Sequence, residues 1–505
     1  MALKIGWAKR DFSLDEPVQL YGQLHIRVSE GIHDPLLATA LAITEEESGH
    51  SVIFLALDLE CPHGGIIDEV KRLVKEACPE IPAEAIVISG THTHGGLILR
   101  ETPPQTLDGK VIYPGTKCRD HVARLAAEAV SEAWKNQKPG GIAFGYGYAV
   151  VGHSRRSTYL ADMSEKMPNN VAPNGHAIMY GKTNDPDFAG YEAGADHFLN
   201  ALFTTDDSEN VTGIIVNIPC PGQTSETLIW QTADFWYNVR LEVEKEFGKG
   251  VFVLNQCAAG GDMAPRILHY NEAQRRKMRL KYGLDYDLSN YHRKDSRPGD
   301  EKYKKTWAEQ LDIGERVITA LREIWSWAKK DIRKEVPIRT SYRVLQMPRR
   351  EITEEMVRGF QKAIDSIEWP RREDCRDEEE YRVLTQRCGA AERRNRRAIK
   401  RYEDSKTAPT IPMRMNVVRI GDVSFVTNRF EVYIDYMHRL QAQSPALQTF
   451  VVQLAGDEDE SYLATERAME NRGYSASIYC NQVSAEAGQY WIRESLAELN
   501  KLFEK

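Results

Sequence analysis

The sequence predicts an α/β fold in which a mixed, largely parallel sheet is flanked by helices and carries helical insertions. In the first third of the chain, short apolar runs alternate with segments of helical periodicity. Further apolar runs recur downstream, and each one ends in polar or glycine- and proline-rich residues. Strand–helix–strand order at such spacings is typical of βαβ units. Because ligand sites of open α/β sheets lie beyond the carboxyl ends of the strands, we expect the functional residues in those loops.

The expected elements follow from the length and the periodicity of the apolar runs. The apolar run at 52–57 predicts a buried strand that ends at Asp58. Apolar residues at helical spacing then predict a helix over 65–76, and the run at 85–89 predicts the next strand. The remaining expected elements are an amphipathic helix at 121–134, strands at 213–218, 251–255 and 423–427, and a closing amphipathic helix at 485–502.

The chain is expected to form one elaborated domain over residues 1–505. It is 42% hydrophobic, and no long linker rich in serine, glycine or proline divides it. Two segments have the composition of insertions, because 268–306 is rich in Tyr, Arg, Lys and Asp and 349–407 is dense in both charge signs. The second segment contains a basic run at 393–397 that could bind phosphate, although such runs more often form a solvated helix face.

Net charge, hydropathy and cysteine usage exclude several classes of protein. The net charge of −8 argues against nucleic-acid binding, which needs a basic surface. No run approaches the roughly 20 apolar residues of a membrane span, and the first residues lack the apolar segment of a signal peptide. The eight cysteines have no paired spacing, which suits reduced thiols. We therefore expect a cytoplasmic protein, with its oligomeric state left open.

The most informative motif is the Thr-His-Thr-His-Gly-Gly segment at 91–96, directly after the strand expected at 85–89. Side chains of an extended chain alternate between two faces, so His92 and His94 are expected to point the same way. Two imidazoles at a strand end suit a metal ligand beside an acid/base group. The alternative is a pair of hydrogen-bonded histidines. The metal site is favoured because neutral imidazole is the commonest protein ligand of metals.

Polar groups also follow the other expected strands. Asp58 and Glu60 follow the first strand, where Asp58 could orient a histidine or cap a turn. The loop at 219–226 holds two prolines and a glycine. The glycine-rich turn at 256–265 carries one acid, Asp262, and could bring backbone N–H groups to an oxyanion. This turn lacks the lysine of a P-loop, so we do not expect nucleotide binding.

The last third of the chain adds a carboxylate and two tyrosines. Glu431 follows the strand expected at 423–427 and could bind metal or favour a helix N-terminus. Tyr462 and Tyr474 stand twelve residues apart, although tyrosines are usually core or surface residues with satisfied hydroxyls. A separate aromatic group suits either a sugar-containing ligand or ordinary packing, and consists of Trp230, Phe235, Trp236 and Tyr237.

The order of these pieces resembles the neutral/alkaline (non-lysosomal) ceramidase superfamily, whose members are zinc-dependent amidases with a Thr-His-Thr-His motif at a strand end. The other matching pieces are the segments 145–147 and 153–156, the Gly-Asp turn at 261–262, the Asn-Arg-Phe-Glu step at 428–431, and the pair Tyr462 and Tyr474. The resemblance covers roughly residues 4 to 500 and corresponds to the catalytic domain only, without the family's immunoglobulin-like C-terminal domain.

The resemblance implies a role for each matching side chain. Zn²⁺, or another divalent metal, would be held by His92, Glu431 and Tyr462. His94 would be a catalytic or oxyanion-binding histidine. Tyr474 would lie near the nucleophile, and Arg155 would lie near the substrate.

Two positions depart from the family pattern. Pro221 takes the place of the family's second histidine ligand, so Cys220 or Gln223 would have to supply the remaining ligand. Ala264 takes the place of the nucleophilic serine and cannot attack a carbonyl carbon. The nucleophile is therefore expected to be a water molecule activated by the metal, with the pKa of that water lowered toward ~7.

Together these features predict a metal-dependent hydrolase that acts on an amide or ester of a soluble small molecule or glycoconjugate. His94 or Asp262 would serve as the general base, while Arg155 and Tyr474 would stabilise the developing negative charge. Two alternatives stay open. One is a metal-assisted lyase or isomerase acting on a sugar acid, and the other is a non-catalytic binding protein that has kept the fold.

Overall fold

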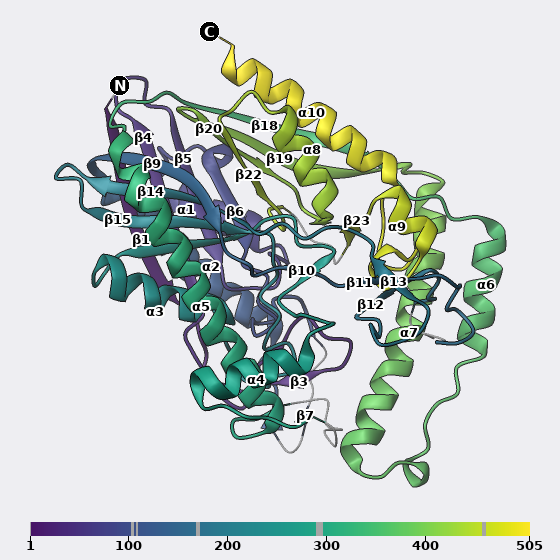
Figure 1. The fold of residues 1–505 in the computed structure, drawn as a ribbon. Helices are drawn as coiled ribbons and strands as arrows, with labels where there is room; N and C mark the ends of the chain where they lie inside the picture. The colour runs from purple at the N-terminus through teal and green to yellow at the C-terminus, as the bar shows by residue number, and fades with distance from the viewer. Residues whose placement is uncertain are drawn as a thin grey trace.

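The computed structural model describes residues 2–102, 106–107, 110–167, 172–288, 296–456 and 461–504. Its largest feature is an eight-stranded sheet with the strand order β16-β15-β14-β9-β1-β4-β5-β6 (Figure 1). The strands of this sheet are β1 (Leu3–Asp11), β4 (Leu37–Glu45), β5 (Ser51–Leu57), β6 (Ile86–Gly90), β9 (Lys138–Tyr148), β14 (Phe198–Asp206), β15 (Val211–Ile218) and β16 (Phe252–Cys257).

A second sheet of four strands packs against the inner face of the first. Its order is β18-β19-β20-β22, and its strands are β18 (Ile338–Pro348), β19 (Thr410–Ile420), β20 (Val423–Thr427) and β22 (Gln448–Val452). The two sheets meet through a shared apolar cluster. Within this cluster the Phe425 ring lies 4.7 Å from the Phe54 ring and 4.5 Å from the Phe450 ring, measured between centroids.

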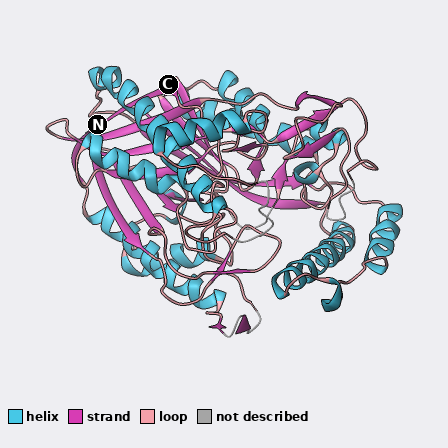
Figure 2. Ribbon diagram, turned by 60° about the horizontal axis from the view of Figure 1, so that its bottom comes forward, coloured by secondary structure: helices cyan, strands magenta, loops and turns pink. Residues whose placement is uncertain are grey.

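Helices cover the outer face of each sheet, so the molecule has four layers (Figures 1 and 2). The large sheet is covered by α1 (Ile66–Ala77) and α2 (Gly115–Lys135) over one part and by α3 (Phe235–Phe247) and α5 (Glu301–Ala328) over the other. The second sheet is covered by α8 (Ile434–Gln443) and α10 (Ala485–Phe503). No helix within the described residues is both long and apolar enough to cross a membrane.

Strand β5 illustrates why this arrangement needs fully apolar strands. Phe54 and Ala56 belong to the cluster between the two sheets, whereas Leu55 and Leu57 belong to the cluster beneath α1 and α2. Successive side chains of a strand point to opposite faces, so a strand buried on both faces has no polar side. The run that predicted this strand from the sequence is thus explained by burial on both of its faces.

The remaining helices include a pair that stands apart from the four layers. Helices α6 (Glu354–Asp365) and α7 (Glu378–Ser405) pack on each other and extend beside the loop region (Figure 2). The other short elements are α4 (Asn271–Tyr282), α9 (Glu466–Asn471), β2 (Gln19–Leu20), β3 (Arg27–Val28), β7 (Thr106–Leu107), β8 (Lys110–Val111), β10 (His153–Ser154), β11 (Arg156–Tyr159), β12 (Ala177–Met179), β13 (Phe188–Tyr191), β17 (Met263–Ala264), β21 (Glu431–Val432), β23 (Tyr462–Leu463) and the 3₁₀ turns Ala83–Ala85, Lys329–Asp331, Arg372–Asp374 and Tyr474–Ala476.

The structure confirms the mixed α/β class, but the expectation of a largely parallel sheet is wrong. In the large sheet, β5–β6 and β15–β16 pair in parallel, and the other five neighbouring pairs are antiparallel. In the second sheet, β20–β22 is parallel and the other two pairs are antiparallel. Strands such as β1 and β9 contain charged residues and glycines, so no apolar run marked them in the sequence.

The two segments with the composition of insertions are helical. The first, 268–306, contains α4 and the start of α5, and its residues 289–295 lie outside the described residues. The second, 349–407, contains α6 and α7. All eight cysteines are free thiols, as their spacing predicted.

Candidate active site

A pocket of about 420 Å³ lies where the loops that follow several strands converge. Each of these loops contributes a polar side chain to the pocket wall. The loop after β5 provides Glu60, the loop after β6 provides His94, and the loop after β15 provides Gln223. Glu431 and Tyr462 come from the short strands that follow β20 and β22. The site therefore lies beyond strand ends, as the sequence predicted.

His92 and His94 are adjacent, but strand alternation is not the cause. Strand β6 ends at Gly90, and His92 has a φ of 62°, in the left-handed region. The expectation of an extended chain is wrong at this point. The turn instead places the two imidazole rings 5.2 Å apart at an angle of 86°. A non-glycine residue in this conformation costs about 1–3 kcal/mol and persists only where the surrounding structure holds it.

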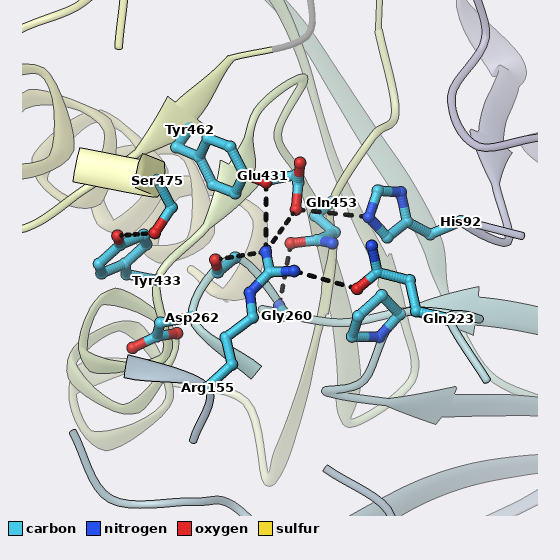
Figure 3. Close-up of polar contacts among 12 residues, drawn as sticks. His92, Arg155, Gln223, Gly260, Asp262, Glu431, Tyr433, Gln453, Tyr462 and Ser475 are labelled. Atoms are coloured by element: carbon cyan, nitrogen blue, oxygen red, sulfur yellow. Dashed lines mark hydrogen bonds and ion pairs between the residues drawn. The ribbon is translucent and has the colours of Figure 1, made fainter. Parts of the chain in front are cut away.

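His92 is held between two acidic residues. Its Nδ1 lies 2.9 Å from the backbone carbonyl oxygen of Glu60, which only accepts, so Nδ1 carries a proton and donates. Its Nε2 lies 3.3 Å from Oε2 of Glu431 (Figure 3). Burial lowers the pKa of His92, but the charges of Glu431 and Glu60 raise it to above its ordinary value. The surroundings therefore favour positive charge here, supplied by a proton or by a metal ion.

Arg155 occupies the centre of the site and neutralises Glu431. Its side chain is 1% exposed, and Nη2 lies 3.1 Å from Oε2 of Glu431 and 3.3 Å from the Tyr462 hydroxyl (Figure 3). The same nitrogen donates to the carbonyl oxygen of Gly261 at 2.8 Å. Burial lowers the pKa of Arg155, but Tyr462, Tyr180 and Glu431 raise it well above its usual range. The guanidinium is therefore a permanent buried charge.

Gln223 links this guanidinium to His94. Arginine can only donate, so the contact of 3.0 Å from Nη1 of Arg155 identifies the acceptor as Oε1 of Gln223. The amide nitrogen of Gln223 then donates to Nε2 of His94 at 2.7 Å. Burial, followed by the positive surroundings, lowers the pKa of His94 well below its ordinary value. His94 is thus a neutral imidazole whose Nε2 accepts and whose Nδ1 carries the proton.

The residues around His92 fit a divalent metal ion. Glu60, His92 and His94 are the one group of three or more potential ligands found in the described part of the chain, and their donor atoms lie within 4.8 Å of one another. Ligand atoms at ~2.2 Å from one zinc ion lie at most ~4.4 Å apart, so a small movement of these side chains toward one another would bring all three donor atoms within reach of one ion. Nε2 of His92 is buried and has the Glu431 carboxylate, 3.3 Å away, as its neighbour, in a geometry too poor for a hydrogen bond. Glu431 adds an anionic oxygen beside the same nitrogen.

Three other predicted ligands take different positions. Cys220 is fully buried in the apolar cluster under α3 and α5, and burial and the neighbouring Cys257 raise the pKa of its thiol well above the usual value. It does not line the pocket. Gln223 lines the pocket, but both ends of its amide are already engaged. Tyr462 contacts Arg155 and lies edge-on to Tyr474, with ring centroids 6.5 Å apart.

The glycine-rich turn has a structural role. The backbone N–H of Gly260 donates to Gln453 at 3.0 Å and that of Gly261 donates to the Val432 carbonyl at 2.9 Å, so the expected oxyanion cradle is wrong. Ala264 is fully buried and pairs with His153 between β17 and β10. No serine or threonine is among the described residues that line the pocket.

Asp262 also lies outside the pocket wall. Its Oδ1 accepts from the backbone N–H of Ile434 at 3.0 Å, at the first residue of α8, and Figure 3 shows the carboxylate pointing away from His92. These contacts indicate a structural role for Asp262 at the start of α8. Burial raises the pKa of this carboxyl to about 7.

Replacement of Asp262 by asparagine tests this structural role. The folded protein keeps the carboxyl protonated up to about pH 7, whereas the unfolded chain releases the proton near 3.8, so wild-type stability should fall as pH rises between these values. Asp262→Asn removes this loss while Oδ1 still accepts from Ile434. We expect equal unfolding free energies near pH 4 and, at pH 8, a variant more stable by a few kcal/mol, on the order of 1.4 kcal/mol per unit of pKa shift. Denaturant titrations at several pH values measure this, and a variant less stable than wild type at pH 8 would contradict it.

Several pocket residues were not identified from the sequence. Tyr180 reaches Gln223 at 3.4 Å, and Arg266 pairs with Glu226 at 2.6 Å beneath it. Arg394 of α7 donates to the Tyr474 hydroxyl at 2.5 Å. Of these, only Arg394 had a visible signal, in the basic run that favoured a solvated helix face. Phe235 and Trp236 are fully buried core residues, which agrees with the alternative of ordinary packing.

Comparison with solved structures relates this fold to the ceramidases. The neutral ceramidase from Pseudomonas aeruginosa matches with a TM-score of 0.62 and 16% identity, over 100% of this chain and 76% of that one. A ceramidase complexed with C2 matches with a TM-score of 0.64 and 15% identity, over 99% of this chain and 76% of that one. No family model matches the sequence, and no curated protein matches it. The chain has the ceramidase fold, so the predicted resemblance is confirmed at the level of the fold.

Proposed function

We propose that this chain is a hydrolase that cleaves an amide or ester bond of a small molecule with the help of a divalent metal ion. The observation that carries the proposal is His92, a buried imidazole fixed by the Glu60 carbonyl and aimed at the Glu431 carboxylate. A strained backbone and two acidic neighbours around one imidazole are typical of a metal-ligand position. The ceramidase fold supports the assignment to the hydrolases.

Glu60 and His92 would hold the ion with Glu431 beside them, while His94 lies at the edge of the group with its Nε2 engaged by Gln223. A divalent ion supplies Lewis-acid activation of water at such a site. The pocket wall offers no serine or threonine in the described residues, which favours water over a side-chain hydroxyl of the family type as the nucleophile. Zn²⁺ suits the imidazole and carboxylate donors, and Mn²⁺ would also accept the carboxylate oxygens.

The surrounding side chains would handle protons and charge. His94 is neutral and can accept a proton at Nε2 once the Gln223 amide moves aside. Tyr474 lines the pocket, and its hydroxyl would donate to the oxygen that gains charge when the carbonyl is attacked. Arg155 keeps Glu431 and Gln223 in position rather than binding substrate, because four of its contacts lie within the protein.

A hydrolysis screen in ¹⁸O-labelled water tests the proposal. We expect turnover of small amides or esters that falls after chelation and returns with Zn²⁺ or Mn²⁺, with one ¹⁸O atom in the acid product. His94→Ala should lower kcat by about 10²–10⁴-fold. His438→Ala is the matched control, because His438 pairs with Asp196 and does not line the pocket. Turnover without ¹⁸O incorporation would point to a lyase or isomerase, and turnover unaffected by chelation would contradict the metal.

A further inference from the structure

Helix α7 forms one wall of the pocket and is fixed at both ends. Near its start, Arg382 donates to the Ile26 carbonyl at 3.0 Å. Near its end, Arg401 donates to the carbonyl oxygens of Ile478 and Asn481, each at 2.7 Å. The side chains that this helix turns toward the pocket therefore hold a defined position above the candidate active site.

The pocket-facing stripe of α7 consists of arginines. Arg393, Arg397 and Arg401 follow one another at intervals of four residues, and Arg394 lies beside them. Like charges at this spacing on a helix repel, and each pair destabilises it by about 0.2–0.5 kcal/mol. An anion bound against the stripe would reduce this repulsion.

The outer face of the same helix is built differently. Arg396 pairs with Glu392 at 2.7 Å, and Lys400 pairs with Asp404 at 2.9 Å, both one turn apart. This face has the alternating charges of a solvated helix. The pocket side differs, because there arginines follow arginines: Arg393 and Arg397 are exposed to solvent, as favoured for the basic run, and they also line the pocket.

The charge balance of the pocket wall is positive. Six arginines and three glutamates line it, with no lysine or aspartate among the described residues. Two of the glutamates are compensated within the protein, because Glu226 pairs with Arg266 at 2.6 Å and Glu431 pairs with Arg155 at 3.1 Å. The arginines of α7 therefore set the charge at this side of the pocket.

The stripe also contacts Tyr474, the proposed hydrogen-bond donor to the substrate. Arg394 donates to the Tyr474 hydroxyl at 2.5 Å, and its guanidinium lies 4.8 Å from the centroid of the same ring. Tyr474 in turn lies against Tyr462. A negative group bound on α7 would thus be adjacent to the place where a substrate carbonyl is expected.

We propose that the arginines of α7 bind an oxyanion group carried by the substrate, so that the substrate is a small anionic amide or ester. The planar guanidinium fork matches the oxygen pairs of carboxylate, sulfate and phosphate groups, which share this chemistry. The proposal rests on the proposed function for the bond that is cleaved, but anion binding by α7 can be measured without turnover.

Calorimetric titration of the intact protein with inorganic phosphate, at constant ionic strength in chloride, tests the anion site. We expect the wild type and Arg396→Ala to bind phosphate alike, and the double variant Arg393→Ala/Arg397→Ala to bind it at least ~10-fold more weakly. Both replaced side chains are exposed, and Arg393→Lys/Arg397→Lys keeps the charge but removes the fork. Equal affinity in all four proteins, or no binding by the wild type at millimolar phosphate, would overturn the proposal.

Paired substrates separate this proposal from the proposed function. Among amides that are hydrolysed, kcat/KM should be higher for a carboxylate-bearing amide than for its methyl ester, and the preference should fall ~10-fold in Arg393→Ala/Arg397→Ala. Hydrolysis with no preference for the anionic member would overturn the proposal while the hydrolase assignment stands. Phosphate binding that depends on Arg393 and Arg397, in a protein that hydrolyses nothing, would keep the anion site and reject the hydrolase.

Discussion

Replacement of His92 by alanine is expected to remove the bound metal and to lower hydrolysis by more than ~10³-fold, which corresponds to about 4 kcal/mol or more of transition-state stabilisation. His92 contacts both the backbone carbonyl of Glu60 and the carboxylate of Glu431, so its loss breaks the ligand group at the centre. Elemental mass spectrometry of protein purified without a chelating column measures the metal. We expect close to one divalent ion per chain in the wild type and a trace amount in the variant.

His92→Asn is the companion variant that guards against misfolding. Asparagine tolerates the left-handed conformation that His92 adopts, so this variant keeps the local backbone without the imidazole. It should fold with a circular dichroism spectrum like that of the wild type and still lose the metal. His438→Ala should keep the metal. Full metal content in both His92 variants would place the ion elsewhere.

Replacement of Arg155 by alanine is expected to destabilise the metal-free protein by about 3–5 kcal/mol, because it removes the permanent positive charge beside the buried Glu431 carboxylate. The exposed Arg396→Ala, which removes only a surface pair, should change stability by less than about 1 kcal/mol. Urea denaturation after treatment with a chelator measures both.

A double-mutant cycle with Glu431 identifies the cause. In Arg155→Ala/Glu431→Gln no uncompensated charge is buried, so much of the lost stability should return. Addition of Zn²⁺ to Arg155→Ala should also restore stability, since a cation near Glu431 replaces the guanidinium charge. If the double variant loses as much stability as the two single variants lose together, the side chains of Arg155 and Glu431 are not coupled.

The parts of the fold that could be predicted are those with an unambiguous apolar pattern. Strand β5 and helix α1 have such patterns, and the expected bounds at 52–57 and 65–76 match Ser51–Leu57 and Ile66–Ala77 closely. Strands β1 and β9 pair antiparallel in the middle of the sheet, yet their sequences contain lysine, arginine and glycine. Their position depends on long-range pairing that no local pattern records, so the sheet direction was predicted wrongly.

The candidate site likewise contains residues that the sequence could predict and contacts that it could not. His94 and Glu431 were expected near one pocket because they follow strands, and Tyr462 because of the ceramidase resemblance; all three line it. The contacts of Arg155 and Gln223 depend on how side chains from distant loops meet, which the sequence does not encode at any fixed spacing. The same limit applies to α7, because its arginines are ordinary surface residues until the fold brings one stripe of the helix over the pocket.

The separation of α7 from the four layers has a consequence for how specificity can change. The strands and their apolar clusters set the positions of the ligand group, while the α6–α7 pair is built from a continuous stretch of chain that packs outside those clusters. Exchange of the charged residues on the pocket side of this pair, with Arg394 and Arg401 kept because they contact Tyr474 and the 478–481 backbone, would therefore alter which molecules are accepted and leave the ligand group in place. Selectivity and reactivity are in this sense carried largely by different parts of the chain.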